Sequence, residues 1–298
     1  MKSLLYIVAI FSLALVSCTE RIPVKEMPDV DNGVITMVKA TVEPLTLQGL
    51  EGVGNYSWNE GHALGIYGTT VGQNECYLPV KTTVGDNEAY FFGNVVGGDL
   101  TIYAPYSKEG STAARNGRVT IPVEQKYYAD PFDHFMYNST FLSTTTVEEV
   151  SFGYHAGLLK IEVKYDIQDI TSVAVFVGNV TPDGGYSDYV AGDLAVDEDV
   201  EETLVNGKSS LVVKGFPEGI DSAINNPLVV WAVVAPGEYE NFVVEISNAE
   251  ATTSVPVKGP FFVAPCALAD KTCVAEKVDH DNTLDDFQGE NGEFNPKN

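Results

Sequence analysis

Short runs of alternating apolar residues recur throughout this chain, and they constrain its fold more than any other feature. They arrive about every 8 to 15 residues and are separated by Gly, Asn, Asp and Pro. No stretch keeps a helical period over three turns, and the 27 Gly and 15 Pro residues interrupt most candidates. The sequence therefore predicts an all-β fold. The clearest expected strands are Val34–Val42, Ala63–Gly68, Glu88–Phe92, Leu100–Ala104, Arg118–Glu124, Leu158–Tyr165, Val173–Val177, Ser210–Lys214, Pro227–Val234, Phe242–Ile246 and Ser254–Lys258.

Three of these runs predict where their strands lie in a sheet. Leu158–Tyr165 alternates most cleanly, with Lys and Glu between the apolar positions, which is typical of a strand with one solvated face. Leu228–Val234 is apolar at every position and predicts a central strand covered on both sides. Pro122 interrupts an otherwise good strand and indicates a sheet edge, because proline cannot donate a ladder hydrogen bond.

The number of expected strands predicts two domains. A single sandwich rarely uses more than about ten strands, so a dozen or more imply two sandwiches in series. We place the division near Thr145–Val150, which gives an N-terminal β-sandwich at 34–150 and a C-terminal one at 151–278. Residues 279–298 are acidic and poor in apolar side chains, which predicts a solvated, poorly ordered tail.

The N-terminus predicts export. Its apolar run, Leu4–Val16, has 13 residues, whereas a bilayer span takes about 20, so 1–17 is typical of a signal peptide. The run ends in Leu15-Val16-Ser17-Cys18, which resembles a bacterial lipobox. In that signal the cysteine thiol receives a diacylglycerol and the peptide is cut just before it, so Cys18 becomes the lipid-bearing first residue. The alternative is an ordinary signal peptide whose cysteine is incidental.

Composition narrows the range of partners. Residues 18–33 are polar and predict a tether between the lipid and the first strand. The 17 basic and 42 acidic residues give a net charge of −25, which argues against binding nucleic acid or anionic lipid head groups. We interpret the acidity as surface solubility. Calcium binding is the alternative, with the acidic run Asp197–Glu202 as a candidate loop.

No catalytic constellation is visible in the sequence. No G-x-S-x-G elbow occurs, and the histidines stand at no metal-ligand spacing. We therefore predict no enzymatic activity, no metal and no cofactor other than the covalent lipid on Cys18. The four scattered histidines are His62, His134, His155 and His280.

The cysteines leave one pairing open. Cys266 and Cys273 are close enough in sequence to bridge a loop or hairpin, which the oxidising exterior would permit. Cys76 has no obvious partner and fits a buried apolar position. With three thiols besides Cys18, the sequence fixes no disulfide.

Four aromatic and glycine motifs follow one another along the chain. Trp58-Asn59-Glu60-Gly61 precedes Leu64-Gly65-Ile66-Tyr67, and Ile102–Ser107 carries the pattern Y-x-P-Y-S. Gln125 follows a Val-containing strand, and Phe152–Leu159 begins the second half. Together they resemble the fimbrillin-like lipoproteins, the type V pilins of the Bacteroidia, whose signatures include W-x-x-G-D-x-I-G-V-Y and F-x-H-x-x-A-x-L. Two positions depart from the family pattern, namely His62, where Asp is usual, and Ala156, which is one residue out of register.

The resemblance implies a fold and a partner. It implies two tandem transthyretin-like β-sandwiches and a fimbrial subunit or surface adhesin rather than an enzyme. Family members reach the outer membrane as lipoproteins, and stalk subunits then lose their first strand to a trypsin-like protease. A neighbouring pilin subunit fills the groove with a donor strand. Lys39 and Arg21 are the basic positions at which such a cut could fall, and a cut after Lys39 would free Ala40.

Several alternatives stay open at this level. The chain could be a stalk, tip or anchor subunit, held at the outer membrane by its lipid or incorporated in a fimbrium, and could contact host or bacterial surface ligands. A non-polymerising surface lipoprotein that binds glycan or calcium is the second hypothesis. A group of four aromatic residues has two possible roles, either as a surface platform for a sugar or as part of the packed core. The four are Trp58, Tyr67, Tyr103 and Tyr106.

Overall fold

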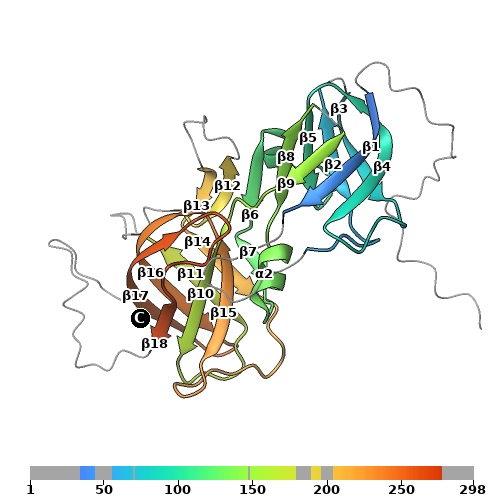
Figure 1. Cartoon of the computed structure of the whole chain (residues 1–298). Coiled ribbons are helices and arrows are strands. Elements are labelled where there is room, and N and C mark those ends of the chain that lie inside the picture. Colours follow the sequence, from blue (N-terminus) through green and yellow to red (C-terminus); the bar gives the residue numbers. More distant parts are fainter. Residues whose placement is uncertain are drawn as a thin grey trace, which may run out of the picture.

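The first half of the chain forms one large sheet, which is the upper part of Figure 1. The computed structural model describes residues 34–43, 56–69, 71–146, 148–178, 189–195 and 204–276. Nearly all regular structure in them is strand, which confirms the all-β prediction. The seven strands are, in spatial order, β8 (Phe141–Thr145), β5 (Leu100–Ala104), β2 (Leu64–Gly68), β3 (Val71–Pro79), β4 (Glu88–Gly97), β1 (Val34–Val42) and β9 (Glu149–Phe152).

The described residues of the second half, together with β6 and β7, form three smaller sheets, in the lower part of Figure 1. One has the order β15 (Leu228–Val234), β10 (Gly157–Lys164) and β18 (Cys273–Glu276). The largest has the order β17 (Thr252–Val263), β16 (Gly237–Ser247), β11 (Ser172–Val177), β14 (Ser210–Lys214) and β7 (Glu124–Lys126). The third has the order β13 (Leu204–Lys208), β12 (Ala191–Ala195) and β6 (Arg118–Ile121).

Alternation in sequence becomes alternation in burial. In β10 the residues Leu159, Ile161 and Val163 are fully buried and the charged residues between them are not, so the expected one-sided strand is confirmed. The expected strand Val34–Val42 coincides with β1. Pro122 lies between β6 and β7, each of which is the edge strand of its sheet, so the expected edge position is confirmed as well.

The segment from β6 to the second helix crosses between the halves. β6 pairs with β12 and β7 pairs with β14, although both precede the expected division near Thr145–Val150. A boundary at residue 150 therefore separates β6 and β7 from the second-half strands with which they pair, and it separates α2 from β15, which α2 contacts. Most buried apolar side chains of the described residues also form one cluster that extends from Val38 to Ala275, and a second, small cluster contains Tyr103, Ala114, Val119 and Leu142.

The strand β15 differs from its prediction. It was expected to be central, but in its sheet it lies beside β10 at one edge. Five of its seven residues are nevertheless buried, because residues 124–137 cover it. A run of apolar residues thus indicates that both faces of a strand are buried, but it does not indicate whether the strand has a neighbour on each side in its sheet.

The described residues include two short helices that were not predicted. α1 (Thr112–Arg115) is capped by the Ser111 hydroxyl, which accepts a hydrogen bond from the Ala114 amide. α2 (Pro131–Tyr137) begins after Asp130, whose carboxylate accepts from the amides at 132 and 133. A capping carboxylate followed by proline at the first turn is a helix-start signal, but these helices are too short to show a helical period.

Candidate functional site

The candidate processing residue Lys39 lies in the middle of β1, inside the sheet. β1 pairs antiparallel with β4 from Val34 to Thr41 and parallel with β9 from Lys39 to Val42. The Lys39 amide donates to the Glu148 carbonyl over 2.8 Å. A protease acts on an extended chain that it can surround, so cleavage after Lys39 requires this part of β1 to leave the sheet.

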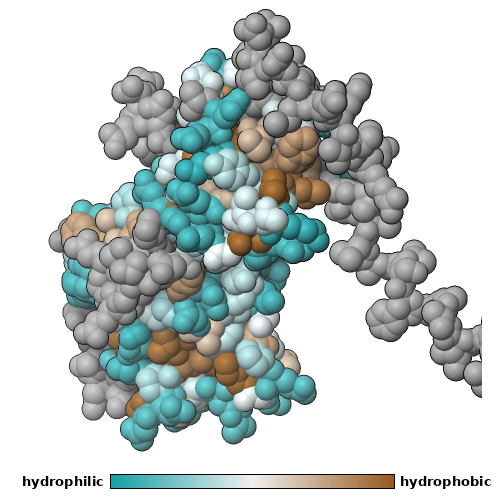
Figure 2. All heavy atoms as spheres, turned by 45° about the vertical axis from the view of Figure 1, so that its right-hand side comes forward, coloured by the Kyte–Doolittle hydropathy of each residue, from teal (hydrophilic) through white to brown (hydrophobic). Residues whose placement is uncertain are grey.

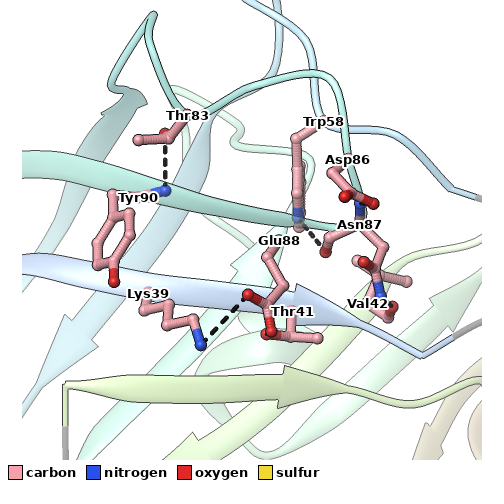
Figure 3. Close-up of polar contacts among 9 residues, drawn as sticks. All are labelled: Lys39, Thr41, Val42, Trp58, Thr83, Asp86, Asn87, Glu88 and Tyr90. Carbon is pink, nitrogen blue, oxygen red and sulfur yellow. Dashed lines mark hydrogen bonds and ion pairs between the residues drawn. The ribbon is translucent and has the colours of Figure 1, made fainter.

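The side chain of Lys39 points to the outer face and forms an ion pair there. Its Nζ lies 3.3 Å from Glu88 Oε2, and Figure 3 shows this contact on the same face as Tyr90. The hydrogen bond and the charge of Glu88 raise the pKa of Lys39. The Glu88 side chain is 52 % exposed, so water screens the pair and the pair holds β1 only weakly.

The opposite face of β1 holds the strand more firmly. Val38, Ala40 and Val42 are fully buried in the core. At the end of the strand, the Val42 amide donates to the Asn87 carbonyl, and Asn87 Nδ2 donates back to the Val42 carbonyl. Figure 3 shows Asn87 between Val42 and Trp58, whose indole Nε1 donates to the same Asn87 carbonyl over 3.0 Å.

The Trp58 signature is therefore a structural anchor for the end of β1. The Trp58 ring is 1 % exposed and contacts the rings of Phe91 and Tyr56 edge to face, at 4.9 and 4.7 Å between centroids. His62 closes the turn from the other side, with Nδ1 3.0 Å from the Tyr56 hydroxyl. The Asn59 amide also donates to His62 Nδ1. His62 thus makes the turn contacts at the position where an aspartate was expected.

The proposed sugar platform does not assemble on the surface. Tyr103, like Trp58, is 1 % exposed, and it stacks on Tyr67 with ring centroids 5.8 Å apart. The Tyr103 ring covers Gly65, where a Cβ atom would lie 2.0 Å from the ring. Core packing therefore explains these aromatics, and it explains why the motif Leu64–Tyr67 contains a glycine.

Gln125, the other family landmark, connects two sheets. It lies on β7 but its side-chain amide occupies the open edge of β15, where Nε2 donates to the Val233 carbonyl over 2.6 Å. Its Oε1 accepts from the Val233 amide over 2.9 Å. Gln125 is 1 % exposed, so this pair of hydrogen bonds replaces a missing neighbour strand inside the core. Apart from the family resemblance, no local pattern around Gln125 indicates this role.

His134 on α2 forms a hydrogen bond with the side chain of Gln125. Its Nε2 lies 3.1 Å from Gln125 Oε1, which already accepts from a backbone amide, so His134 Nε2 must carry the proton. Nδ1 is then an acceptor, and among the described residues it has no hydrogen-bond partner. Burial lowers the pKa of His134 to about 4. We call Gln125, His134 and Val233 the β15 clasp.

The two cysteines that could bridge are thiols in the structure. Cys273 is fully buried in β18, and burial raises the pKa of its thiol to about 12. Cys266 lies in the preceding loop in the left-handed region, and its amide donates to the Ala156 carbonyl. Cys76 is half-buried on β3 rather than fully buried. A Cys266–Cys273 bridge stays a prediction for the oxidised protein.

Several predicted residues lie outside the described part of the chain. These are Cys18, Arg21, the tether 18–33, the acidic run Asp197–Glu202, and the tail 279–298 with His280. Within the described ranges no group of His, Cys, Asp and Glu could hold a metal ion. No helix in those ranges is long and apolar enough to cross a bilayer.

A small cavity lies where the two halves meet. It is lined by residues from β6, from α2 through the start of β8, and from the loop between β9 and β10, including Phe135, Ser139 and His155. Its volume is about 10 Å³, which is room for about one water molecule. An organic ligand would not fit.

Comparisons with known proteins give only distant likenesses. No protein-family model matches this chain, and no curated protein matches it. The chain is similar to a solved candidate cell adhesion protein from Bacteroides ovatus at 10 % identity and TM-score 0.41, with 77 % of this chain and 87 % of that one covered. A candidate cell adhesion protein from Bacteroides uniformis has 15 % identity and TM-score 0.34, over 76 % and 86 % of the two chains. The tip fimbrial protein Mfa3 from Porphyromonas gingivalis has 10 % identity and TM-score 0.27, over 74 % and 80 %. These scores are too low for any argument about this chain to rest on them.

Proposed function

We propose that this chain is an exported surface lipoprotein of the fimbrillin-like type, acting as a fimbrial assembly subunit or a fimbria-associated adhesin. The ordered motifs and the lipobox-like end at Cys18 motivate the proposal. The observation that carries it is the position of β1, which is the first described strand after the expected tether and is inserted between β4 and β9.

Loss of the first part of β1 would create an acceptor for another strand. A cut after Lys39 would remove Val34–Lys39, whose partners on β4 are Tyr90–Gly97. Ala40–Val42 would stay paired with β9. An incoming donor strand needs main-chain partners and a pocket for its side chains. The exposed edge of β4 would supply the main-chain partners, and the space left by the buried Val38 side chain would supply the pocket.

Mass spectrometry of the mature N-terminus on intact cells tests the export and processing steps. A lipidated Cys18 supports an anchor or a stand-alone lipoprotein, and a start at Ala40 supports a cleaved subunit. Cys18→Ala should leave the precursor unlipidated and absent from membrane fractions, whereas the matched variant Cys76→Ala should not. A Cys18→Ala protein that stays firmly membrane-bound contradicts the lipid anchor.

A peptide-exchange experiment tests the acceptor groove separately. The chain is cut after residue 39 through an introduced protease site, the released segment is removed, and a synthetic peptide with the sequence of Val34–Lys39 is added. We expect the peptide to bind and to restore hydrogen-exchange protection to the β4 amides, while a peptide with the same residues in scrambled order does neither. If the cut protein binds neither peptide, the result argues against strand addition.

Glycan binding without polymerisation is the second function we propose, because one exposed tyrosine stacks on a half-buried one. Tyr128 and Tyr137, next to and on α2, stack with ring centroids 4.8 Å apart and an interplanar angle of 17°. Tyr137 is 65 % exposed, and an open aromatic face suits the apolar face of a sugar. Tyr137→Ala should abolish signals on a glycan array, with Tyr189→Ala, another exposed tyrosine, as the control.

A further inference from the structure

A row of exposed apolar side chains crosses the outer face of the N-terminal sheet. Met37 on β1 is paired with Phe92 on β4, and Phe92 is paired with Leu78 on β3. Tyr90 is two residues from Phe92 on the same strand and therefore on the same face. Their exposed fractions are 39 % for Met37, 41 % for Phe92, 44 % for Leu78 and 38 % for Tyr90.

Register makes these four residues one surface. Side chains directly opposite each other on paired strands lie about 5 Å apart, so the three adjacent strands bring them into contact distance. We call them the outer apolar row. Apolar side chains also gather on the upper part of the molecule in Figure 2, between hydrophilic ones. Contiguous exposed apolar surface with a polar rim is typical of a protein-binding site.

The rim of the row is acidic. On one side Lys39 is opposite Tyr90, but its charge is already paired with Glu88. Glu149, which is exposed on β9, is opposite Lys39 on the other side. The rim therefore presents two carboxylates, Glu88 and Glu149, and one ammonium group, which is already paired with Glu88.

This charge pattern decides between partners. A second copy of the chain would bring the same carboxylates together and would carry the same net charge of −25, so self-association is opposed. A partner with Lys or Arg around an apolar centre would gain both apolar burial and charge complementarity. We infer that the outer apolar row is a docking surface for a different protein, whose contact patch is apolar at its centre and basic at its rim.

The inference is independent of strand release. The row uses side chains on the outer face, whereas a donor strand would use the β4 edge and the core pocket of Val38. A failure of the peptide-exchange experiment would therefore leave the docking surface untouched.

Site-specific photo-cross-linking in cells that produce the full chain tests the inference. The cross-linking residue p-benzoylphenylalanine replaces Phe92 and, as the control, Phe262, which is 49 % exposed on β17. We expect a discrete adduct from position 92 and not from position 262. The captured protein is then identified and purified, and its affinity is measured.

The affinity measurements complete the test. Phe92→Ser and Leu78→Ser should each weaken binding of the purified partner by about tenfold or more, as expected for the centre of an interface. Glu149→Lys should weaken it as well and reduce its salt dependence. Circular dichroism checks that each variant is folded, and Leu78→Ser carries the test if Phe92→Ser unfolds. The absence of an adduct at 92, an adduct with a second copy, or binding that Glu149→Lys leaves unchanged overturns the inference.

Discussion

Each half of this protein holds one strand whose partners lie far away in the sequence, but the two strands are held with different chemistry. In the first half, β1 is fixed by fully buried aliphatic side chains, and its ion pair, Lys39–Glu88, lies on the solvated face. In the second half, β7 pairs with β14 over only three positions, and the β15 clasp joins it to the neighbouring sheet through buried hydrogen bonds. The position of β1 therefore depends on apolar packing, whereas the position of β7 depends on hydrogen bonds between buried polar groups.

This difference predicts which mutations and which pH changes should destabilise each half. Apolar packing is insensitive to pH, and an exposed ion pair can be removed at little cost. A buried hydrogen-bond network leaves orphaned groups when one member is lost or changes its protonation. Four predictions, from the largest expected effect to the smallest, test the contrast.

Trp58→Ala should be the most damaging change in the first half. It removes a buried indole that contacts Phe91 and the hydrogen bond to the Asn87 carbonyl. We expect a loss of about 4 kcal/mol in the free energy of unfolding, measured by urea denaturation. Tyr137→Ala, at an exposed aromatic, should change the free energy by less than about 0.5 kcal/mol. Equal effects at both positions would contradict the anchoring role of Trp58.

Gln125→Ala should be the corresponding change in the second half. It leaves the buried Val233 amide and carbonyl without their partners, which costs about 3 kcal/mol. Hydrogen exchange should show faster exchange of the Val233 amide before global unfolding. The matched variant Gln168→Ala, at an exposed glutamine, should have neither effect. If Val233 stays protected in Gln125→Ala, the clasp does not close the β15 edge.

Acid should weaken the clasp through His134. The folded pKa is about 4, below the ordinary value of 6.5, so the unfolded chain takes up the proton first. The stability contribution is complete above pH 6.5 and is lost as the pH falls to 4, with about 2 kcal/mol gone at pH 5. The stability difference between wild type and His134→Gln, which keeps a donor for Gln125, should change over this range. A difference that is constant with pH would contradict the neutral, Nε2-protonated histidine.

Lys39→Gln should be the mildest change. The ion pair with Glu88 lies on the solvated face, so the urea midpoint should stay close to that of the wild type. Under the proposed processing, the same variant should resist a trypsin-like protease at this position, while Lys81→Gln, at a second lysine that also forms an ion pair, should be cut as the wild type is. A large drop in the urea midpoint would mean that the exposed pair matters more than the packing.

Much of the strand pattern was predictable, and the errors have physical causes. The ranges Val34–Val42, Leu100–Ala104 and Ser210–Lys214 coincide with β1, β5 and β14 because alternating apolar residues mark a half-buried strand. The polar stretch Val71–Pro79 was missed, since β3 is held by main-chain pairing with β2 and β4 rather than by an apolar pattern of its own. β12 and β13 were missed as well.

The candidate sites were also only partly predictable from the sequence. Lys39 could be found from its basic side chain beside the N-terminus, but its place between two strands could not. Gln125 could be noted as a landmark, yet its function depends on Val233, which is 108 residues away. Contacts of that separation carry no local signal, because neither residue's neighbours in sequence reveal the pairing.

The sequence by itself determined the class of structure: an all-β chain with an expected export signal at Cys18 and strands whose inner faces are set by a period of two. That information is local, because propensity, alternation and turn residues act over a few positions. Only the tertiary structure decided that residues 118–137 cross into the second half, that β15 is an edge closed by a side-chain amide, and that four apolar side chains meet on the outer face. Those features arise from strand order and register, which are selected by the packing of the whole core rather than by any one segment.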